Sequence, residues 1–277
     1  MADRGAASGR EGLDVARLRE LAVRSDGVWR ELTVVEATGS TNADLRAAAA
    51  DGAPTGTVLV AEEQLAGRGR LGRTWQAPAR ASVAVSVLLR PPATEGWGWL
   101  PLVAGVAVAE AVTRLTGLSV GVKWPNDVLL PEGKVAGILV ERVPTATGPA
   151  LVAGVGVNVT QSVDELPPTP AGSHPSTSLL LAGASAVDRT ELTGVILDRL
   201  AEGYRSWLGD RPGLRRRCLE WSSTVGTPVR AHLPGGAVHE GLATTLDDEG
   251  RLVVVTVDGP VAVGAGDIVH LRGAAPT

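Results

Sequence analysis

The sequence has a single cysteine, Cys218, among 277 residues. The chain can therefore form neither an internal disulfide nor a thiolate metal cluster. Its formal net charge is −4, whereas a general nucleic-acid-binding domain is clearly basic, so we expect no nucleic acid among its partners. The start of the sequence shows no signal-peptide pattern, and we expect a cytoplasmic protein.

Long hydrophobic runs are also absent. The longest uncharged apolar stretch, near Gly96 to Ala109, is interrupted by Pro101 and ends at Glu110. It is shorter than the roughly 20 residues of a membrane-spanning helix, so we predict no membrane segment. The G-x-x-x-x-G-K-[ST] motif of a P-loop ATPase and the G-x-S-x-G motif of a serine hydrolase are missing too, which argues against both classes.

The most informative stretch is Gly67 to Arg73, which holds three glycines and three arginines in seven residues. Its glycines match the G-x-G-x-x-G pattern of a dinucleotide-binding loop, but such a loop opens a helix. Residues 82–89 instead alternate valines as a strand does, which counts against a nicotinamide oxidoreductase. Guanidinium groups donate paired hydrogen bonds to phosphate or carboxylate, and glycines let the backbone approach such a ligand closely. We therefore predict a loop that folds over an anionic ligand. A solvated basic hairpin tip is the alternative.

The periodicity of apolar residues changes along the chain and predicts an α+β protein. Before residue 223 it predicts helices over residues 13–24, 43–50, 100–115, 188–208 and 212–222, and strands over 33–37, 57–61, 82–89, 128–130, 134–141 and 150–158. From residue 227 short strands follow one another, which is typical of a small β-barrel. Residues 1–12 have too few apolar side chains to build a core and are expected to be disordered.

Three short segments carry polar groups or glycine at informative places. Ser40, Thr41 and Asn42 stand at a helix start, where they can cap the helix or hold a small polar ring. Residues 124–127, Trp-Pro-Asn-Asp, together with Lys134 across a predicted hairpin, are either turn formers or ligands for Mg²⁺ and phosphate. Gly154 and Gly156 inside a strand indicate a bulge or a close approach to the backbone.

In this order, these segments resemble the biotin protein ligases, of the shorter type that lacks a DNA-binding domain. The resemblance covers about residues 30–272 and is carried by residues 39–42, Gln64, 67–75, 123–127, 133–141, 154–158 and 266–270. One departure is Leu71, where the familiar loop has a second consecutive arginine.

The resemblance implies an α+β fold with a central mixed β-sheet flanked by helices, as in the biotin/lipoate ligases and class II aminoacyl-tRNA synthetases, followed by a small C-terminal SH3-like β-barrel. The resemblance also implies three parts of the chain. Residues 1–28 form a disordered N-terminus and a short helix, and residues 29–222 form the catalytic domain that binds biotin and ATP. Residues 223–277 form the barrel.

The resemblance also implies a two-step reaction. Biotin is activated with ATP and Mg²⁺ as biotinyl-5'-AMP, and biotin is then transferred to a lysine of a biotin carboxyl carrier domain of an acyl-CoA carboxylase. Carried over residue by residue, the biotin site comprises Ser40, Thr41, Asn42, Gln64, Arg68, Gly69, Arg70 and Lys134. The ATP site comprises Arg68, Arg70, Trp75, Asn126, Lys134 and Asn158. Lys134, Arg70 and Asp127 are the candidate catalytic residues, and Asp127 is also the candidate metal ligand and a candidate base for transfer.

Several alternatives stay open at this point. Lipoate ligases share the fold and the adenylation chemistry, and a non-catalytic biotin- or nucleotide-binding module would carry the same site. A biotin-sensing repressor needs a DNA-binding element, which the first 30 residues are too few to hold. The family includes both monomers and homodimers, so both states remain possible.

Overall fold

The central element of the computed structural model is a mixed seven-stranded sheet. The structure describes residues 9–23, 27–92, 95–169, 174–184 and 186–271. In spatial order the strands are β1 (Glu31–Val35), β2 (Thr57–Ala61), β5 (Ser82–Leu89), β9 (Ala150–Asn158), β8 (Gly133–Val143), β7 (Asp127–Leu130) and β6 (Gly121–Lys123). The β1–β2 pair is parallel and the other pairs are antiparallel. The predicted mixed sheet is confirmed.

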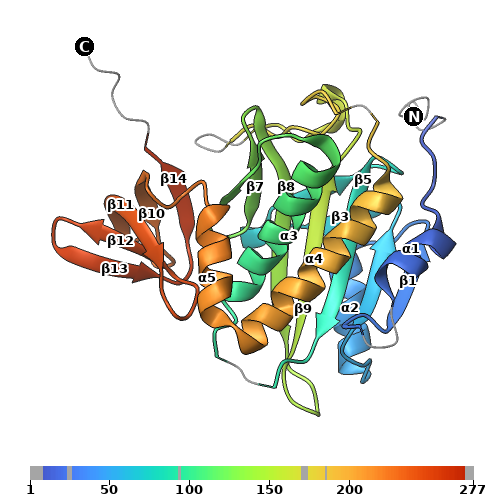
Figure 1. The fold of residues 1–277 in the computed structure, drawn as a ribbon, viewed down its shortest axis with the longest axis horizontal. Coiled ribbons are helices and arrows are strands. Elements are labelled where there is room, and N and C mark those ends of the chain that lie inside the picture. Colours follow the sequence, from blue (N-terminus) through green and yellow to red (C-terminus); the bar gives the residue numbers. More distant parts are fainter. Residues whose placement is uncertain (1–8, 24–26, 93–94, 170–173, 185, 272–277) are drawn as a thin grey trace.

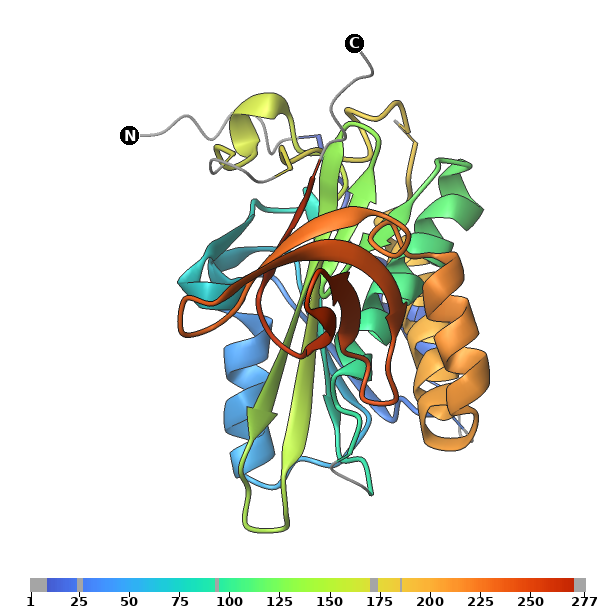
Figure 2. The same cartoon turned by 90° about the vertical axis from the view of Figure 1, so that its left-hand side faces the viewer.

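Helices cover both faces of this sheet (Figures 1 and 2). Packed on one side are α1 (Val15–Ala22), α3 (Trp99–Thr116), α4 (Arg189–Gly209) and α5 (Arg211–Glu220), and on the other is α2 (Thr41–Ala50). Strand β5 is buried along its whole length because it has a helix layer on each face. Val85 and Val87 join the core beneath α3 and α4, whereas Leu88 packs with Leu45 of α2.

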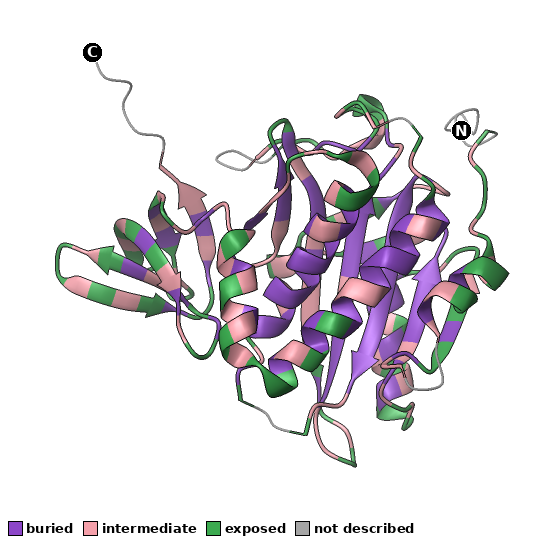
Figure 3. Cartoon of the chain, viewed as in Figure 1, coloured by how far each residue is buried: buried purple, intermediate pink, exposed green. Residues whose placement is uncertain are grey.

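Helix α3 is the most apolar helix of the protein. By length and composition it could cross a membrane, but 67% of its apolar window is buried inside the protein. Figure 3 shows it lying against the buried central strands. Its apolar surface is therefore accounted for by the core.

The C-terminal strands form a separate antiparallel sheet of five strands beside α5 (Figure 1). In spatial order they are β13 (Gly259–Val263), β12 (Leu252–Thr256), β11 (Val238–Leu246), β10 (Pro228–His232) and β14 (Asp267–His270). The curved, barrel-like sheet agrees with the predicted small β domain.

Two local predictions differ from the structure. Residues 1–8 lie outside the described residues, but Arg10, which was expected to be disordered, forms an ion pair with Glu165 at 2.6 Å. The sequence has three consecutive arginines at residues 215–217, and such a charge run on a helix is expected to face solvent. That expectation is wrong for Arg217, whose guanidinium binds the carboxylate of Glu110 on α3. A long arginine side chain on α5 can reach a carboxylate that the sequence places more than 100 residues away.

A buried ion pair ties α4 to the end of β2. Arg189 Nη1 lies 2.7 Å from Glu62 Oε2, and the two side chains are 7% and 4% exposed. The other oxygen of Glu62 accepts from the backbone N–H of Leu13, and Arg189 Nη2 donates to the carbonyl of Glu11. Both charges are thereby compensated, and the segment before α1 is fixed across the sheet.

Replacing Glu62 by alanine leaves the Arg189 guanidinium buried without its counter-charge. We expect the free energy of unfolding to fall by about 3–5 kcal/mol. Glu240→Ala is the matched control, because it removes the partner of Arg230 from a pair whose side chains are 43% and 53% exposed. That change should cost less than about 1 kcal/mol. Urea unfolding of both variants checks the prediction, and equal losses would contradict it.

Candidate functional site

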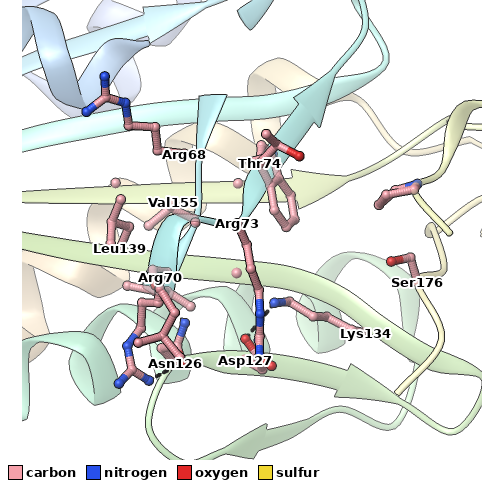
Figure 4. A pocket seen from close by; sticks show the side chains of 18 of the residues that line it. Arg68, Arg70, Arg73, Thr74, Asn126, Asp127, Lys134, Leu139, Val155 and Ser176 are labelled. Atoms are coloured by element: carbon pink, nitrogen blue, oxygen red, sulfur yellow. Dashed lines mark hydrogen bonds and ion pairs between the residues drawn. The ribbon is translucent and has the colours of Figure 1, made fainter. Parts of the chain in front are cut away.

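One cavity of about 370 Å³ opens between the large domain and the start of β14. Its volume lies in the range of small-molecule sites. The structure brings all twelve predicted site residues together at its wall: Ser40, Thr41, Asn42, Gln64, Arg68, Gly69, Arg70, Trp75, Asn126, Asp127, Lys134 and Asn158. These residues come from five separate stretches of the chain, and Figure 4 shows part of the wall that they form.

The first stretch is the start of α2. Ser40 occupies the N-cap position, but its side chain makes no capping hydrogen bond. Thr41 instead contacts the side chain of Gln64: its backbone N–H donates to Gln64 Oε1 at 2.9 Å, and its hydroxyl oxygen lies 3.0 Å from the same atom. The capping interpretation of these hydroxyls is therefore wrong. They form part of a polar wall that is almost completely buried.

Strand β9 forms the floor of the cavity, and its glycines make room for two side chains. A Cβ atom at Gly154 would overlap the amide of Asn42, and one at Gly156 would overlap the indole of Trp75. The prediction of a close approach to this strand is confirmed. Trp75 Nε1 is buried against Gly156 and has no hydrogen-bond partner among the described residues.

The arginine-rich stretch is the tip of a hairpin formed by β3 (Gln64–Arg68) and β4 (Thr74–Ala77). A short 3₁₀ turn, Arg70–Gly72, closes it, and Leu71 adopts a left-handed conformation with φ of 57°. Because a strand follows the turn, the structure agrees with the rejection of a dinucleotide-binding helix. Figure 4 shows Arg68 lying apart from Arg70 and Lys134.

Two arginines attach this hairpin to other parts of the chain. Arg70 donates through Nη1 to Asn126 Oδ1 at 2.9 Å and through Nη2 to the carbonyl of Gly266 at 3.3 Å. Arg73 Nη2 lies 2.7 Å from the carboxylate of Asp267, at the start of β14. The hairpin is therefore connected to the C-terminal domain.

Lys134 and Asp127 face each other across the β7–β8 hairpin, as their positions in the sequence predict. Lys134 Nζ lies 2.7 Å from Asp127 Oδ1, and the two side chains are 25% and 19% exposed. The ammonium also lies 5.9 Å from the centroid of the Trp75 ring. The Lys134 ammonium is thus held at the cavity wall between the Asp127 carboxylate and the Trp75 ring.

Basic groups dominate the electrostatics of the cavity. Five basic side chains line it, Arg68, Arg70, Arg73, Lys123 and Lys134, against two carboxylates, Asp127 and Asp267. Burial lowers the pKa of Arg70 and of Lys123, partly offset by the two carboxylates. Burial alone would raise the pKa of Asp267, but the hydrogen bond and charge of Arg73, with Lys123 and Arg70, outweigh it and lower the pKa. The cavity therefore favours an anionic ligand.

The two asparagines of the predicted ATP site are held by protein contacts. Asn126 Nδ2 donates to the carbonyl of Ile138, so its Oδ1 faces Arg70. Asn158 Nδ2 donates to the carbonyl of Thr177, and its Oδ1 accepts from Gln161. Asn126 therefore orients an arginine, and Asn158 fixes the end of β9 beside the cavity.

The residues around Asp127 can be compared with what Mg²⁺ requires. Across the described ranges, no group of three or more His, Cys, Asp or Glu side chains is arranged to hold a metal ion. Mg²⁺ in nucleotide sites, however, commonly uses one or two carboxylates plus the substrate phosphates. Asp127 on the cavity wall fits that second arrangement.

Three further charged residues of the wall, Lys123, Arg73 and Asp267, were not predicted as site residues. Lys123, which is buried, lies three positions before Asn126. Arg73 closes the arginine-rich stretch, and Asp267 belongs to the C-terminal segment 266–270. Each lies inside a stretch that the sequence had marked. The contact between Arg73 and Asp267 could not be predicted from the sequence, because it depends on how the two domains are placed.

Comparison with known proteins places the chain among its relatives. Residues 34–158 match the biotin/lipoate A/B protein ligase family, and residues 224–271 match the biotin protein ligase C-terminal domain. The chain is 44% identical, over 95% of its length and 97% of the relative's, to a biotin--[acetyl-CoA-carboxylase] ligase of Mycobacterium tuberculosis. It belongs to the biotin protein ligase family.

Two other members of the family extend the comparison. A biotin--[acetyl-CoA-carboxylase] ligase of Paracoccus denitrificans is 34% identical over 83% of this chain and 97% of its own. The solved structure of the biotin protein ligase of Aquifex aeolicus, in complex with biotin and ATP, superposes with a TM-score of 0.72 at 27% identity. The match covers 88% of this chain and 100% of that one. The predicted fold is therefore that of the biotin protein ligases.

The Arg73–Asp267 pair should control the mobility of the arginine hairpin. Asp267→Asn weakens this contact and makes local opening of the hairpin more frequent. Because local opening exposes the backbone to a protease, we expect trypsin to cleave within residues 68–73 at least several-fold faster. Asp258→Asn, at an exposed turn of the same domain, is the control and should cleave like the wild type. Mass spectrometry of timed digests identifies the cut, and identical rates in both variants would refute the connection.

Proposed function

We propose that this protein adenylates biotin with ATP and transfers biotin from biotinyl-5'-AMP to a lysine of a biotin carboxyl carrier domain of an acyl-CoA carboxylase. One observation carries the proposal: a single cavity joins a polar, uncharged wall at Thr41, Asn42 and Gln64 to a cationic wall at Arg70 and Lys134. The first wall suits a small polar ring and the second suits a carboxylate beside a phosphate.

In the first step, a biotin carboxylate oxygen attacks the α-phosphorus of ATP. The new bond is an acyl–phosphate C–O–P linkage, and the bond to pyrophosphate breaks. Two anions must approach each other, and each repels the other until positive charge lies between them. Lys134 and Arg70, fixed by Asp127 and Asn126, supply that charge at predetermined positions. Fixed charges need little rearrangement during the reaction.

Trp75 and Asp127 have supporting roles in the proposal. The Trp75 ring, laid against Gly156, offers a flat apolar surface on which the adenine stacks. Asp127 would hold Mg²⁺ together with the phosphates, and bound Mg²⁺ would neutralise developing charge on the phosphate oxygens. Asn158 contributes by fixing the end of β9 next to the nucleotide.

In the second step, the neutral amine of the acceptor lysine attacks the acyl carbon, an amide forms, and AMP leaves. An amine is a nucleophile only without its extra proton, so a nearby base helps the step. Asp127 is the candidate, because its carboxylate lines the cavity beside Lys134. We propose that the reaction takes place in the cytoplasm and that the protein acts as a monomer or a homodimer.

A lipoate ligase is the second candidate, since the family model covers both activities. The uncharged wall distinguishes them. The ring of biotin is a cyclic urea with N–H donors and a carbonyl acceptor, whereas the dithiolane ring of lipoate has neither. Thr41 and Asn42 are buried and already paired with protein groups, but the side-chain oxygens of Thr41 and Gln64 keep lone pairs that a ring N–H can use and a dithiolane cannot. The site therefore favours biotin.

The adenylation step can be measured without an acceptor. We expect labelled pyrophosphate to exchange into ATP when biotin is present, and not with lipoate or without an acid, because exchange requires reversible formation of the acyl adenylate. Exchange with lipoate alone would contradict the proposed substrate. No exchange with either acid, from folded protein supplied with Mg²⁺, would contradict the proposed enzyme.

Lys134→Ala should strongly reduce this exchange in a protein that still folds. Removing a charge aimed at the reacting phosphate lowers the rate by about 10²–10³-fold on the scale of other electrostatic stabilisers. The free energy of unfolding should change by less than about 1–2 kcal/mol, because the lysine is partly exposed and its ion pair is screened by solvent. Arg230→Ala, on the C-terminal sheet, is the control and should keep wild-type exchange. Retained activity in Lys134→Ala would contradict the role given to this lysine.

A further inference from the structure

Ser86 lies directly behind the polar wall of the cavity. It belongs to β5, is completely buried, and pairs in register with Gly154 of β9. Its hydroxyl donates to Asn42 Oδ1 at 2.6 Å and lies 2.7 Å from Thr41 Oγ1. Ser86 is not among the residues that line the cavity, but it touches two that are.

The orientation of the Asn42 amide is determined by its other partners. Asn42 Nδ2 lies 3.2 Å from the carbonyl oxygen of Leu139 and 2.9 Å from Glu141 Oε2. Neither a carbonyl nor an ionised carboxylate has a proton to give, so the amide nitrogen must face them. Asn42 Oδ1 therefore faces Ser86 and can only accept. The single proton of Ser86 is committed to Asn42.

This commitment decides where the proton of Thr41 points. The 2.7 Å contact between Thr41 and Ser86 needs one proton, and only Thr41 can supply it. The contact from Thr41 Oγ1 to Gln64 Oε1 is longer, at 3.0 Å, and Gln64 Oε1 already accepts the backbone N–H of Thr41. Any other arrangement of the two hydroxyl protons leaves either the 2.6 Å contact between Ser86 and Asn42 or the 2.7 Å contact between Thr41 and Ser86 without a proton. The hydroxyl proton of Thr41 thus points inward, and its lone pairs are left for the cavity.

We infer that Ser86 is a positioning residue that fixes the Thr41 hydroxyl as a hydrogen-bond acceptor toward the ligand. The site then selects a ligand ring with an N–H donor at that place, such as a cyclic urea or amide, and discriminates against a ring oxygen or sulfur there. This inference rests on the proposed function, in which the ring is that of biotin.

The test compares biotin with its two cyclic carbamate analogues, in which one or the other ring N–H is replaced by oxygen. Isothermal titration calorimetry of wild-type protein should show at least tenfold weaker binding of the analogue that places oxygen at Thr41. In Ser86→Ala the Thr41 hydroxyl loses Ser86 as its acceptor, and its proton can turn toward Gln64 Oε1, 3.0 Å away, or toward the ring oxygen of the analogue. We therefore expect the ratio of the two dissociation constants to fall to within about threefold.

Two further variants keep the test decisive. Ser86→Cys nearly preserves the volume and replaces the hydroxyl by a weakly hydrogen-bonding thiol, so it should show the same loss of discrimination even where Ser86→Ala does not fold. Ser82→Ala removes another buried hydroxyl from β5, one without a hydrogen-bond partner in the described structure, and should keep the wild-type ratio. A general loosening of the strand would weaken biotin and the analogue alike and leave the ratio unchanged.

The outcomes test the role of Ser86 separately from the proposed function. An unchanged ratio in folded Ser86 variants would overturn the role of Ser86 and leave biotin as the ligand. A wild-type protein that binds neither biotin nor the analogues would overturn the proposed function itself.

Discussion

The cavity depends on positive charges being kept close together in a place where they repel one another. Arg70, Lys123 and Lys134 would lower their mutual repulsion by turning into solvent, and burial adds a further penalty for Arg70 and Lys123. Three groups hold them: Asp127 binds Lys134, Asn126 binds Arg70, and Asp267 adds negative charge nearby. The central sheet brings Lys123, Asp127 and Lys134 together, because β6, β7 and β8 are neighbouring antiparallel strands.

The sheet also supplies the second requirement of the site, which is space at its surface. A strand normally presents a side chain at every second position of a face, but β9 has glycine at 154 and 156. The backbone there can be approached by the amide of Asn42 and the indole of Trp75. These two side chains divide the floor of the cavity into a polar part and an aromatic part. Glycine within the strand thus determines where each kind of ligand group can lie.

The sequence predicted much of this structure because its strongest signals are local. Alternating valines marked β5 with its observed ends, and the alanine-rich stretch after Asn42 marked α2. The predicted site residues also reach one cavity, since each motif stands at the end of an element. Contacts between distant segments were not predictable in the same way. Arg217 with Glu110, Arg73 with Asp267, and Ser86 behind Thr41 all depend on tertiary placement, and Ser86 in a valine-rich strand carries no local sign of a polar network.

The ion pair between Lys134 and Asp127 has a consequence for how anions bind. A phosphate or carboxylate that reaches Lys134 meets an ammonium that already has a partner 2.7 Å away. Its binding is therefore an exchange of one anion for another, and its free energy is the difference between two ion pairs. Such a site discriminates between ligands by geometry and by the number of contacts they make, because charge alone gains little from the exchange.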